Sequence, residues 1–261
     1  MSGIIDKFRL DGRLAAVTGG NGKYGKQMVI ALAEAGARVC IASRRASQEQ
    51  DFADSLRARG LNVFSAPLDQ GDRESIDAFV AQMDAEGGLD ILVNNAVSRG
   101  AANDRDWDGY VQSLMVNGVG LADLTTKVAK GMAAKGGGSI INIGSYMGIL
   151  GGDDTLYRET EMPQLHDFSS YYFFCKGGMT NFTRFMAAKF GPENVRVNVL
   201  QLGGLFNNQP ELFVQRYSDR TFLKRMANQT DVMGAVVWLA SDASAYITGA
   251  SIPVDGGYSA K

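Results

Sequence analysis

Cysteine and histidine are scarce in this sequence, and their scarcity excludes two kinds of site. The chain has two cysteines and one histidine among 261 residues. Cys40 and Cys175 both lie in apolar stretches, which favours small buried hydrophobic residues over a disulfide framework. Because His166 is the only histidine and no cysteine is suitably spaced beside it, the sequence predicts no metal site.

Long apolar runs and blocks of basic residues are also missing. No run of 18 apolar residues is present, so we expect no membrane span. Residues 1–13 carry charges without an apolar core, which is unlike a signal peptide. The net charge is −2 and no basic block stands out, so we expect no nucleic acid and no membrane surface as a partner. A reducing cytoplasm is the expected compartment.

Proline is rare, with 5 residues, whereas glycine is abundant, with 32. This combination suits many tight turns between strands and helices rather than a disordered, proline-rich chain. Short apolar runs that predict strands alternate with stretches that predict helices. The predicted strands are 14–18, 37–42, 62–66, 89–93, 139–143, 195–200 and 251–254, and the predicted helices are 26–35, 47–59, 73–84, 106–134, 172–190 and 230–240.

This alternation indicates βαβ units and a parallel sheet. Since such crossovers are right-handed, we predict the α/β class, with one Rossmann-type, doubly wound sheet of about seven strands. No linker or internal repeat divides the chain, so we expect a single domain over residues 1–261. Ligands of such sheets bind at the carboxyl ends of the strands.

A glycine-rich turn follows the first predicted strand and precedes the first predicted helix. It reads Gly19-Gly20-Asn21-Gly22-Lys23-Tyr24-Gly25. Glycine permits close backbone approach, and the helix behind the turn offers free N–H groups and its positive dipole end to a pyrophosphate. A glycine-rich turn without a ligand is the alternative, but the position of this turn favours a dinucleotide site.

The end of the second strand should select between the two nicotinamide cofactors. An acidic residue there binds the ribose hydroxyl of NAD, whereas arginine suits the 2′-phosphate of NADP. The chain has Ser43-Arg44-Arg45 at this point and no acid. Because guanidinium groups match phosphate geometry, we predict NADP(H) in preference to NAD(H). A solvated surface pair of arginines is the alternative.

A tyrosine and a lysine four residues apart suggest an acid/base pair. Tyr172 and Lys176 share one face of the predicted helix, and a fixed ammonium stabilises the phenolate. Ser145, which follows the fifth strand, could hold a carbonyl or alcohol oxygen nearby. On its own this pattern is weak evidence, because one such pair arises easily by chance.

In combination, these motifs resemble those of the short-chain dehydrogenase/reductase family of the classical type, over essentially the whole chain. The glycine-rich loop matches at Thr18, Gly19, Lys23 and Gly25, and Asn94-Asn95-Ala96 matches the family motif after the fourth strand. The catalytic tetrad matches at Asn117, Ser145, Tyr172 and Lys176. The resemblance implies a cofactor site made of Gly19, Asn21, Gly22, Lys23, Tyr24, Gly25, Ser43, Arg44, Arg45, Leu68, Asp69, Asn95, Ala96, Tyr172, Lys176, Gly203 and Leu205.

The resemblance also implies the roles of the tetrad. Tyr172 would be the general acid/base, and Lys176 would lower its pKa and hold the nicotinamide ribose. Ser145 would bind the substrate oxygen, and Asn117 would hold a water in a proton relay. Family members usually form homotetramers through two long helices, here 106–134 and 172–190, so we expect a homotetramer, with a homodimer as the alternative.

Several positions depart from the family pattern. Lys23 replaces the middle glycine of the loop, although Gly22 is adjacent to it. Val97 replaces the last glycine of Asn-Asn-Ala-Gly, and Leu202 replaces the proline that usually follows the sixth strand. Asn207 is the candidate for the residue that binds the cofactor's carboxamide. These changes affect the expected cofactor geometry more than the expected reaction.

Ser145 and Tyr172 are 27 positions apart, about twice the family's usual spacing. The additional segment, 149–168, is polar and includes His166, which we expect to be a lid residue. It is similar to Tyr-x-x-Thr-x-Met insertions in family members that resemble sugar and polyol oxidoreductases. A surface lid or an oligomer contact without a substrate role is the alternative. Segment 203–225 is expected to form the second pocket wall, with Phe206, Phe213, Tyr217 and Phe222 as pocket or core residues.

The sequence therefore predicts an NADP(H)-dependent oxidoreductase that interconverts a secondary alcohol and a ketone on a small sugar, polyol or sugar derivative. Two alternatives stay open. A 3-oxoacyl-thioester reductase would use the same tetrad, and a non-catalytic NADP(H)-binding regulator could keep the same fold. The polar insertion argues against the first alternative, and the complete tetrad argues against the second.

Overall fold

Seven short, largely apolar segments form the strands of the computed structural model, which describes residues 3–98, 107–165 and 170–260. Apart from the two edge strands, β3 and β7, they are mostly buried, as expected when both faces of a parallel sheet are covered. The strands are β1 (Leu14–Thr18), β2 (Arg38–Ser43), β3 (Val63–Pro67), β4 (Ile91–Asn94), β5 (Gly138–Ile143), β6 (Val195–Leu202) and β7 (Ser251–Val254).

The strands pair in the order β3-β2-β1-β4-β5-β6-β7, and every pairing is parallel. The chain therefore builds outwards from β1 to β3, then crosses back and continues from β4 on the other side of β1. The chain leaves the carboxyl ends of β1 and β4 in opposite directions along the sheet. A doubly wound sheet binds its ligand at such a reversal. The predicted Rossmann-type fold is confirmed.

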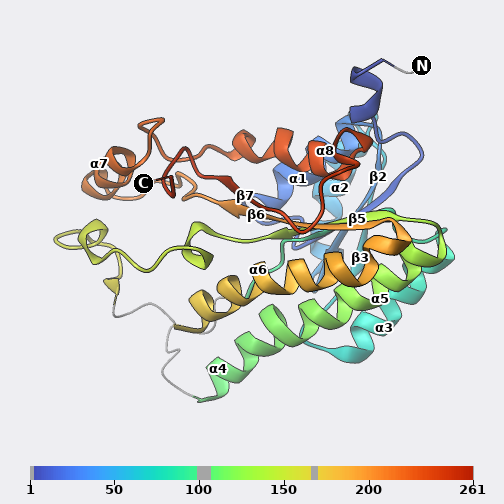
Figure 1. Cartoon of the computed structure of the whole chain (residues 1–261), viewed down its shortest axis with the longest axis horizontal. Coiled ribbons are helices and arrows are strands. Elements are labelled where there is room, and N and C mark those ends of the chain that lie inside the picture. The colour runs from blue at the N-terminus through green and yellow to red at the C-terminus, as the bar shows by residue number, and fades with distance from the viewer. Residues whose placement is uncertain (1–2, 99–106, 166–169, 261) are drawn as a thin grey trace.

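Helices cover both faces of the sheet (Figure 1). On one face, α1 (Gly25–Glu34), α2 (Gln50–Arg57) and α8 (Met233–Ala240) enclose a core that includes Met28, Leu56 and Val236. On the other face, α3 (Arg73–Ala85), α5 (Leu121–Ala134) and α6 (Ser170–Phe190) enclose a core that includes Phe79 and Met132. Both cores share the central strands, so the described residues form one domain.

The predicted helix over 106–134 is interrupted. Its described part consists of α4 (Trp107–Leu114), a π-helix at Met115–Gly120 and then α5. The wider π turn brings Gly120 against the loop after β3, where a Cβ atom on Gly120 would lie 1.6 Å from the Gln70 carbonyl oxygen. Asn117, one of the predicted tetrad residues, lies inside this irregular turn, and π turns are frequent at functional sites.

The remaining predicted elements shift by a few residues. The helix over 47–59 begins with a 3-10 turn at Ala46–Glu49, and the looser segment after β6 contains α7 (Glu211–Arg220). Figure 1 shows α7 beside the chain segment that follows β5, away from the sheet. Within the described residues, no helix combines the length and the apolar composition that crossing a membrane requires.

Candidate functional site

The glycine-rich turn lies between β1 and α1 and packs against the end of β4. The Thr18 hydroxyl accepts hydrogen bonds from the backbone N–H groups of Asn95 and Ala96, at 3.0 and 2.8 Å. The Asn95 side chain donates to the carbonyl oxygens of Thr18 and Gly19, both at 2.9 Å. These bonds fix the turn beside the β4 loop, which explains why the two motifs occur together.

Glycine is required at two positions of this turn. A Cβ atom on Gly25 would lie 2.3 Å from the Gly19 carbonyl oxygen, and Gly19 itself has a φ of +62°. Gly22 does not have a positive φ, and its N–H donates to the Gly19 carbonyl at 2.9 Å. The turn therefore accommodates Lys23 at the position where the family has its middle glycine. Gly25 is the position at which the absence of a Cβ atom lets the Gly19 carbonyl oxygen come close.

A large cleft opens over the carboxyl ends of the central strands, with a volume of about 1300 Å³. It brings together residues from the turn, from the β2 and β4 ends and from α6. The predicted site residues that line it are Gly19, Asn21, Gly22, Lys23, Tyr24, Ser43, Arg44, Arg45, Leu68, Asp69, Asn95, Ala96, Ser145, Tyr172, Lys176, Gly203 and Leu205. Gly25 and Asn117 are the predicted site residues that do not line it.

The end of the cleft beside the glycine-rich turn has room and polar groups for a dinucleotide. The Asn21 side-chain oxygen is buried there without a hydrogen-bond partner. Arg44 and Arg45 are exposed and line the cleft, and neither is joined to a carboxylate by an ion pair within the described chain. Asp69 lies at the end of β3, where its carboxylate accepts from the Gly71 N–H at 2.9 Å.

Lys176 and Tyr172 lie one turn apart on α6, with the Lys176 Nζ 5.8 Å from the centre of the Tyr172 ring. The Lys176 side chain is buried, and its ammonium donates to the Ile143 carbonyl oxygen at 2.6 Å. Since Ile143 ends β5 and Ser145 follows two residues later, this bond ties the tyrosine helix to the serine loop. Ser145, Tyr172 and Lys176 line the same cleft.

Asn117 lies in the π-helix, and both polar atoms of its side chain bind the loop after β4. Its Oδ1 accepts from the Ser98 N–H at 2.8 Å, and its Nδ2 donates to the Ser98 carbonyl at 2.6 Å. The amide therefore holds the loop after β4 against the π-helix.

Two acidic residues of the inserted segment form ion pairs with arginines of α7. Arg220 of α7 donates to the Asp153 carboxylate at 2.7 Å, and Arg216 pairs with Glu159 at 3.4 Å. The cleft receives Tyr157, Met162 and Pro163 from this segment. Tyr157 is buried against Phe213, with 5.4 Å between ring centres. His166 lies outside the described residues.

A cluster of tyrosines forms the wall behind this aromatic pair. Tyr146 and Tyr217 both lie near Tyr258, with ring centres 4.7 and 4.9 Å apart. Burial raises the pKa of Tyr146 and of Tyr217, and it raises the pKa of Tyr258 to about 12. These hydroxyls therefore stay neutral over the working range of enzymes. Of the four aromatic candidates in 203–225, Phe213 and Tyr217 line the cleft, whereas Phe206 and Phe222 are exposed and do not.

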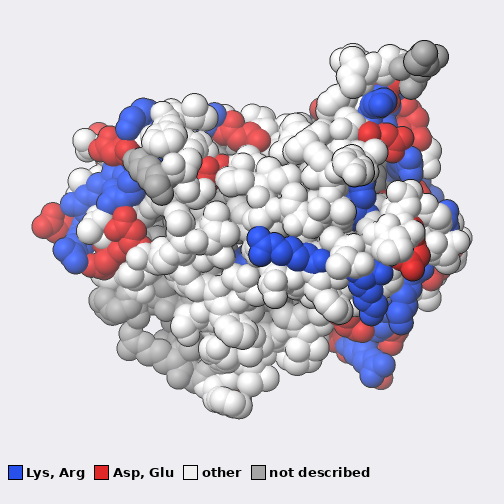
Figure 2. All heavy atoms as spheres, in the orientation of Figure 1, with Lys and Arg blue, Asp and Glu red and all other residues white. Residues whose placement is uncertain are grey.

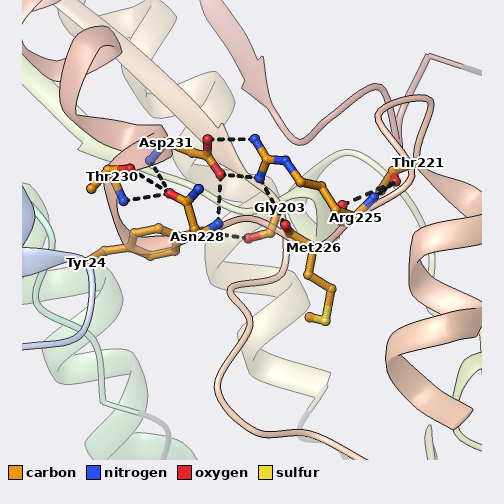
Figure 3. Close-up of polar contacts among 8 residues, drawn as sticks. All are labelled: Tyr24, Gly203, Thr221, Arg225, Met226, Asn228, Thr230 and Asp231. Carbon is orange, nitrogen blue, oxygen red and sulfur yellow. Dashed lines mark hydrogen bonds and ion pairs between the residues drawn. The ribbon is translucent and has the colours of Figure 1, made fainter. Parts of the chain in front are cut away.

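The wall after β6 is held by polar contacts that the sequence did not reveal (Figure 3). The Tyr24 hydroxyl donates to the Gly203 carbonyl at 3.4 Å, which joins the glycine-rich turn to this wall. Both guanidinium NH2 groups of Arg225 donate to Asp231, at 2.5 and 2.8 Å, and Asn228 caps the turn before α8. These contacts order the loop although Leu202 stands where the family usually has proline.

Neither cysteine is part of the chemistry. Burial raises the pKa of the Cys40 thiol to about 12, and burial also raises the pKa of Cys175. Both thiols are free and buried, as the sequence predicted. In the part of the chain that the structure describes, no group of three His, Cys, Asp or Glu side chains is arranged to hold a metal ion.

Comparison with known proteins identifies the family. A family model described as enoyl-(acyl carrier protein) reductase matches residues 24–259. Galactitol 2-dehydrogenase (L-tagatose-forming) of Cereibacter sphaeroides is 34% identical over 260 residues and covers 96% of both chains. The 2-dehydro-3-deoxy-D-gluconate 5-dehydrogenase of Escherichia coli is 32% identical and covers 99% of this chain and all of its own.

Solved structures agree with these relatives. A gluconate 5-dehydrogenase from Burkholderia cenocepacia, crystallised in complex with NADP and tartrate, superposes with a TM-score of 0.86 at 29% identity. The match covers 99% of this chain and all of the other. Together with the sheet order and the matching motifs, these similarities show that the chain is an oxidoreductase acting on CH–OH groups, a member of the short-chain dehydrogenase/reductase family.

Proposed function

We propose that this protein interconverts a secondary alcohol and a ketone with NADP(H), using Tyr172 as the general acid/base. One observation carries the proposal. The Tyr172 phenol, the Lys176 ammonium and the Ser145 hydroxyl converge on one cleft that also contains the glycine-rich turn. A reaction at a carbinol carbon requires a proton donor, an oxygen-binding group and a hydride carrier side by side, and this cleft can hold all three.

Ser145, Tyr172 and Lys176 each have a separate role in this reaction. Ser145 donates a hydrogen bond to the substrate oxygen and orients it towards the Tyr172 hydroxyl. Tyr172 gives its proton to that oxygen in reduction and takes it back in oxidation. The buried Lys176 stabilises the phenolate by its charge, since an opposite charge nearby favours the ionised form of a group. The nicotinamide, when bound, supplies or accepts the hydride.

Tyr172→Phe tests this assignment. We expect it to lower kcat by at least 100-fold, because the ring remains but the proton donor is removed. Cofactor affinity, measured by quenching of intrinsic fluorescence, should stay within about threefold of wild type. Tyr246→Phe, the same change at a fully exposed tyrosine that does not line the cleft, serves as the control. Unchanged turnover in Tyr172→Phe would contradict the assignment of Tyr172 as the acid/base, whereas cofactor binding by the wild type without turnover of any tested substrate would favour a cofactor-binding regulator.

The preference for NADP(H) rests on Arg44 and Arg45. A charge-assisted contact to the 2′-phosphate is worth about 1.5–3 kcal/mol, which corresponds to about 10–100-fold in affinity. Arg44→Ala with Arg45→Ala should reduce kcat/KM for NADP by that factor and change kcat/KM for NAD by less than about threefold. Arg59→Ala, at an exposed ion pair with Glu34, is the control. A higher kcat/KM of the wild type with NAD would overturn the preference.

We infer a sugar, a polyol or a sugar derivative as the substrate. The support comes from the galactitol, gluconate and related dehydrogenases among the relatives, and from the hydroxyl and aromatic groups of the cleft. Aromatic faces pack against the C–H face of a sugar, and Tyr157, Phe213 and Tyr217 offer such faces here. A screen of sugars and polyols with both cofactors, followed by absorbance of the reduced nicotinamide, tests the substrate class.

A 3-oxoacyl-thioester reductase remains the second candidate, because the same tetrad would serve it and the matching family model is described as an enoyl-(acyl carrier protein) reductase, a name that refers to acyl chains carried as thioesters. Acetoacetyl thioesters belong in the same screen. Activity on these thioesters without activity on any keto-sugar would replace the sugar proposal while leaving the roles of the tetrad intact. Oxidation of a polyol without activity on thioesters would exclude this candidate.

We also propose a homotetramer, built through α4 and α6. Figure 2 shows that the surface over these helices is almost free of charged residues. Several large apolar side chains are exposed on it, among them Trp107, Phe174 and Phe185. A patch of this kind on a monomer is typical of a protein–protein interface.

A further inference from the structure

A glutamine lies fully buried near the carboxyl end of the apolar strand β6. Gln201 has no exposed surface, and each of its polar atoms is paired. Its Oε1 accepts from the Ser145 backbone N–H at 2.9 Å. Its Nε2 donates to the Thr180 hydroxyl at 2.8 Å and to the Ser251 hydroxyl at 3.1 Å. A buried amide with this many partners fixes the groups that it joins.

The space around the Gln201 amide is shaped for it. A Cβ atom on Gly144 would lie 2.2 Å from the Gln201 Oε1, so the residue before Ser145 must be glycine for the amide to reach Ser145. Ser145 itself is extended, with φ −153° and ψ 150°, and its hydroxyl accepts from the Met147 N–H at 3.2 Å. Gln201 holds the backbone N–H of Ser145, and the orientation of this backbone sets the direction of the Ser145 side chain.

The same amide reaches the helix that carries the proposed acid. Thr180 lies one turn beyond Lys176 on α6, and Lys176 lies one turn beyond Tyr172. Gln201 therefore joins the Ser145 loop to α6 through one side chain. The Lys176 ammonium on the Ile143 carbonyl is a second tie between the same two elements. The distance between the Ser145 hydroxyl and the Tyr172 phenol depends on these two ties.

We propose that Gln201 is a positioning residue, which sets the Ser145 hydroxyl relative to the Tyr172 phenol. The inference rests on the proposed function of Ser145 and Tyr172. An amide suits the task because it accepts on one atom and donates on the other at the same time. Gln201 has no place in the cleft lining, so it acts through Ser145 and touches neither substrate nor cofactor.

Gln201→Met tests the proposal, because methionine nearly matches the volume but neither accepts from Ser145 nor donates to Thr180. We expect kcat to fall at least tenfold, with the dissociation constant of NADPH within about twofold of wild type. Asn198→Leu is the matched control. Asn198 is a buried amide on the same strand whose partners are Ile247 and Ala250, far from Ser145. It should lower the melting temperature and leave kcat within about threefold.

Two further measurements separate positioning from general destabilisation. In a double-mutant cycle, Gln201→Met should cost little in a Ser145→Ala background, because the hydroxyl that it positions is then absent. Gln201→Glu should be most active at low pH, where the protonated carboxyl can still donate and accept. Burial raises the pKa of a carboxyl, so this activity should fall as pH rises through the raised pKa.

Full additivity of Gln201→Met with Ser145→Ala would overturn the proposal, as would a kcat of Gln201→Met within twofold of wild type. These outcomes are distinct from failure of the proposed function, which would appear as unchanged turnover in Tyr172→Phe. If Gln201→Met does not fold, Gln201→Glu and Gly144→Ala apply the same test, since an alanine at 144 pushes directly on the Gln201 Oε1.

Discussion

Single atoms decide whether the glycine-rich turn can close. A Cβ atom on Gly25 would meet the Gly19 carbonyl oxygen at 2.3 Å and the Gly20 Cα at 2.9 Å, and both are backbone atoms that cannot rotate away. Gly25→Ala should therefore open the turn and raise the dissociation constant of NADPH at least tenfold, measured by fluorescence titration. Gly234→Ala is the control, because its Cβ would meet nothing within 4 Å and alanine stabilises a helix by about 0.5–1 kcal/mol. Equal NADPH affinity in the two variants would contradict the proposed phosphate site.

At the scale of single residues, the sequence predicts the proposed catalytic residues better than the residues that position them. Ser145, Tyr172 and Lys176 could be named because their functional groups and order match a known pattern, and the cleft brings them together. Gln201 could not be identified, because a glutamine within an apolar strand shows that some buried partner exists without showing which one. Phe222 was a candidate for the pocket, but the direction of a side chain in a loop does not follow from its residue type.

At the scale of elements, hydrophobic periodicity predicts where strands and helices lie but not how helices are interrupted. The stretch over 106–134 reads as one helix because its apolar positions recur at helical spacing. The π-helix at Met115–Gly120 arises from packing against Gln70, whose Nε2 donates to the Val116 carbonyl at 2.8 Å. That contact joins residues 46 positions apart, so periodicity within one helix cannot reveal it.

The inserted segment and α7 behave as one wall because ion pairs join them. The Asp153–Arg220 pair is partly buried, and pairs of this kind contribute about 1 kcal/mol or less. Arg220→Met should loosen the wall and raise KM about two- to fivefold without changing kcat, as measured in steady-state assays with the substrate from the screen. Arg13→Met, at an exposed pair with Asp242, should change neither constant. A KM unaffected by Arg220→Met would show that the wall is held by its aromatic contacts alone.

The same pair makes a prediction about pH. Hydrogen bonds from Arg220 and Thr155 outweigh burial and hold the pKa of Asp153 below its ordinary value. A carboxyl with a lowered folded-state pKa contributes stability above its unfolded pKa, about 3.9, and loses it as pH falls through the lower folded value. The difference in melting temperature between wild type and Arg220→Met should thus be constant from about pH 5 to 9 and shrink below about pH 4. Thermal scans across this range measure it, and a difference that varies between pH 6 and 9 would contradict this assignment.

At the scale of the whole molecule, the face over α4, the π-helix and α6 is the interface of the proposed homotetramer. Trp107, Val111, Met115 and Val119 follow one another at every fourth position, and all four are exposed. Phe174 and Phe185 lie three helical turns apart on the same side of α6 and are also exposed. A monomer would leave this apolar stripe in water, at a cost of about 25 cal/mol per Å² relative to burial.

A second copy of the chain is the occupant that covers this stripe in the proposed homotetramer. The wild type should elute with a mass of about 112 kDa by light scattering, four times the chain mass of 28.0 kDa. Phe185→Asp places a charge in the centre of the proposed interface, where an unpaired charge is costly, and should reduce the assembly to a dimer or monomer. Ile5→Asp is the control, because Ile5 is also an exposed apolar residue but belongs to the N-terminal 3-10 turn, which lies away from α6 (Figure 1). A tetramer that survives Phe185→Asp would move the interface to another face, and a monomeric wild type would exclude the assembly.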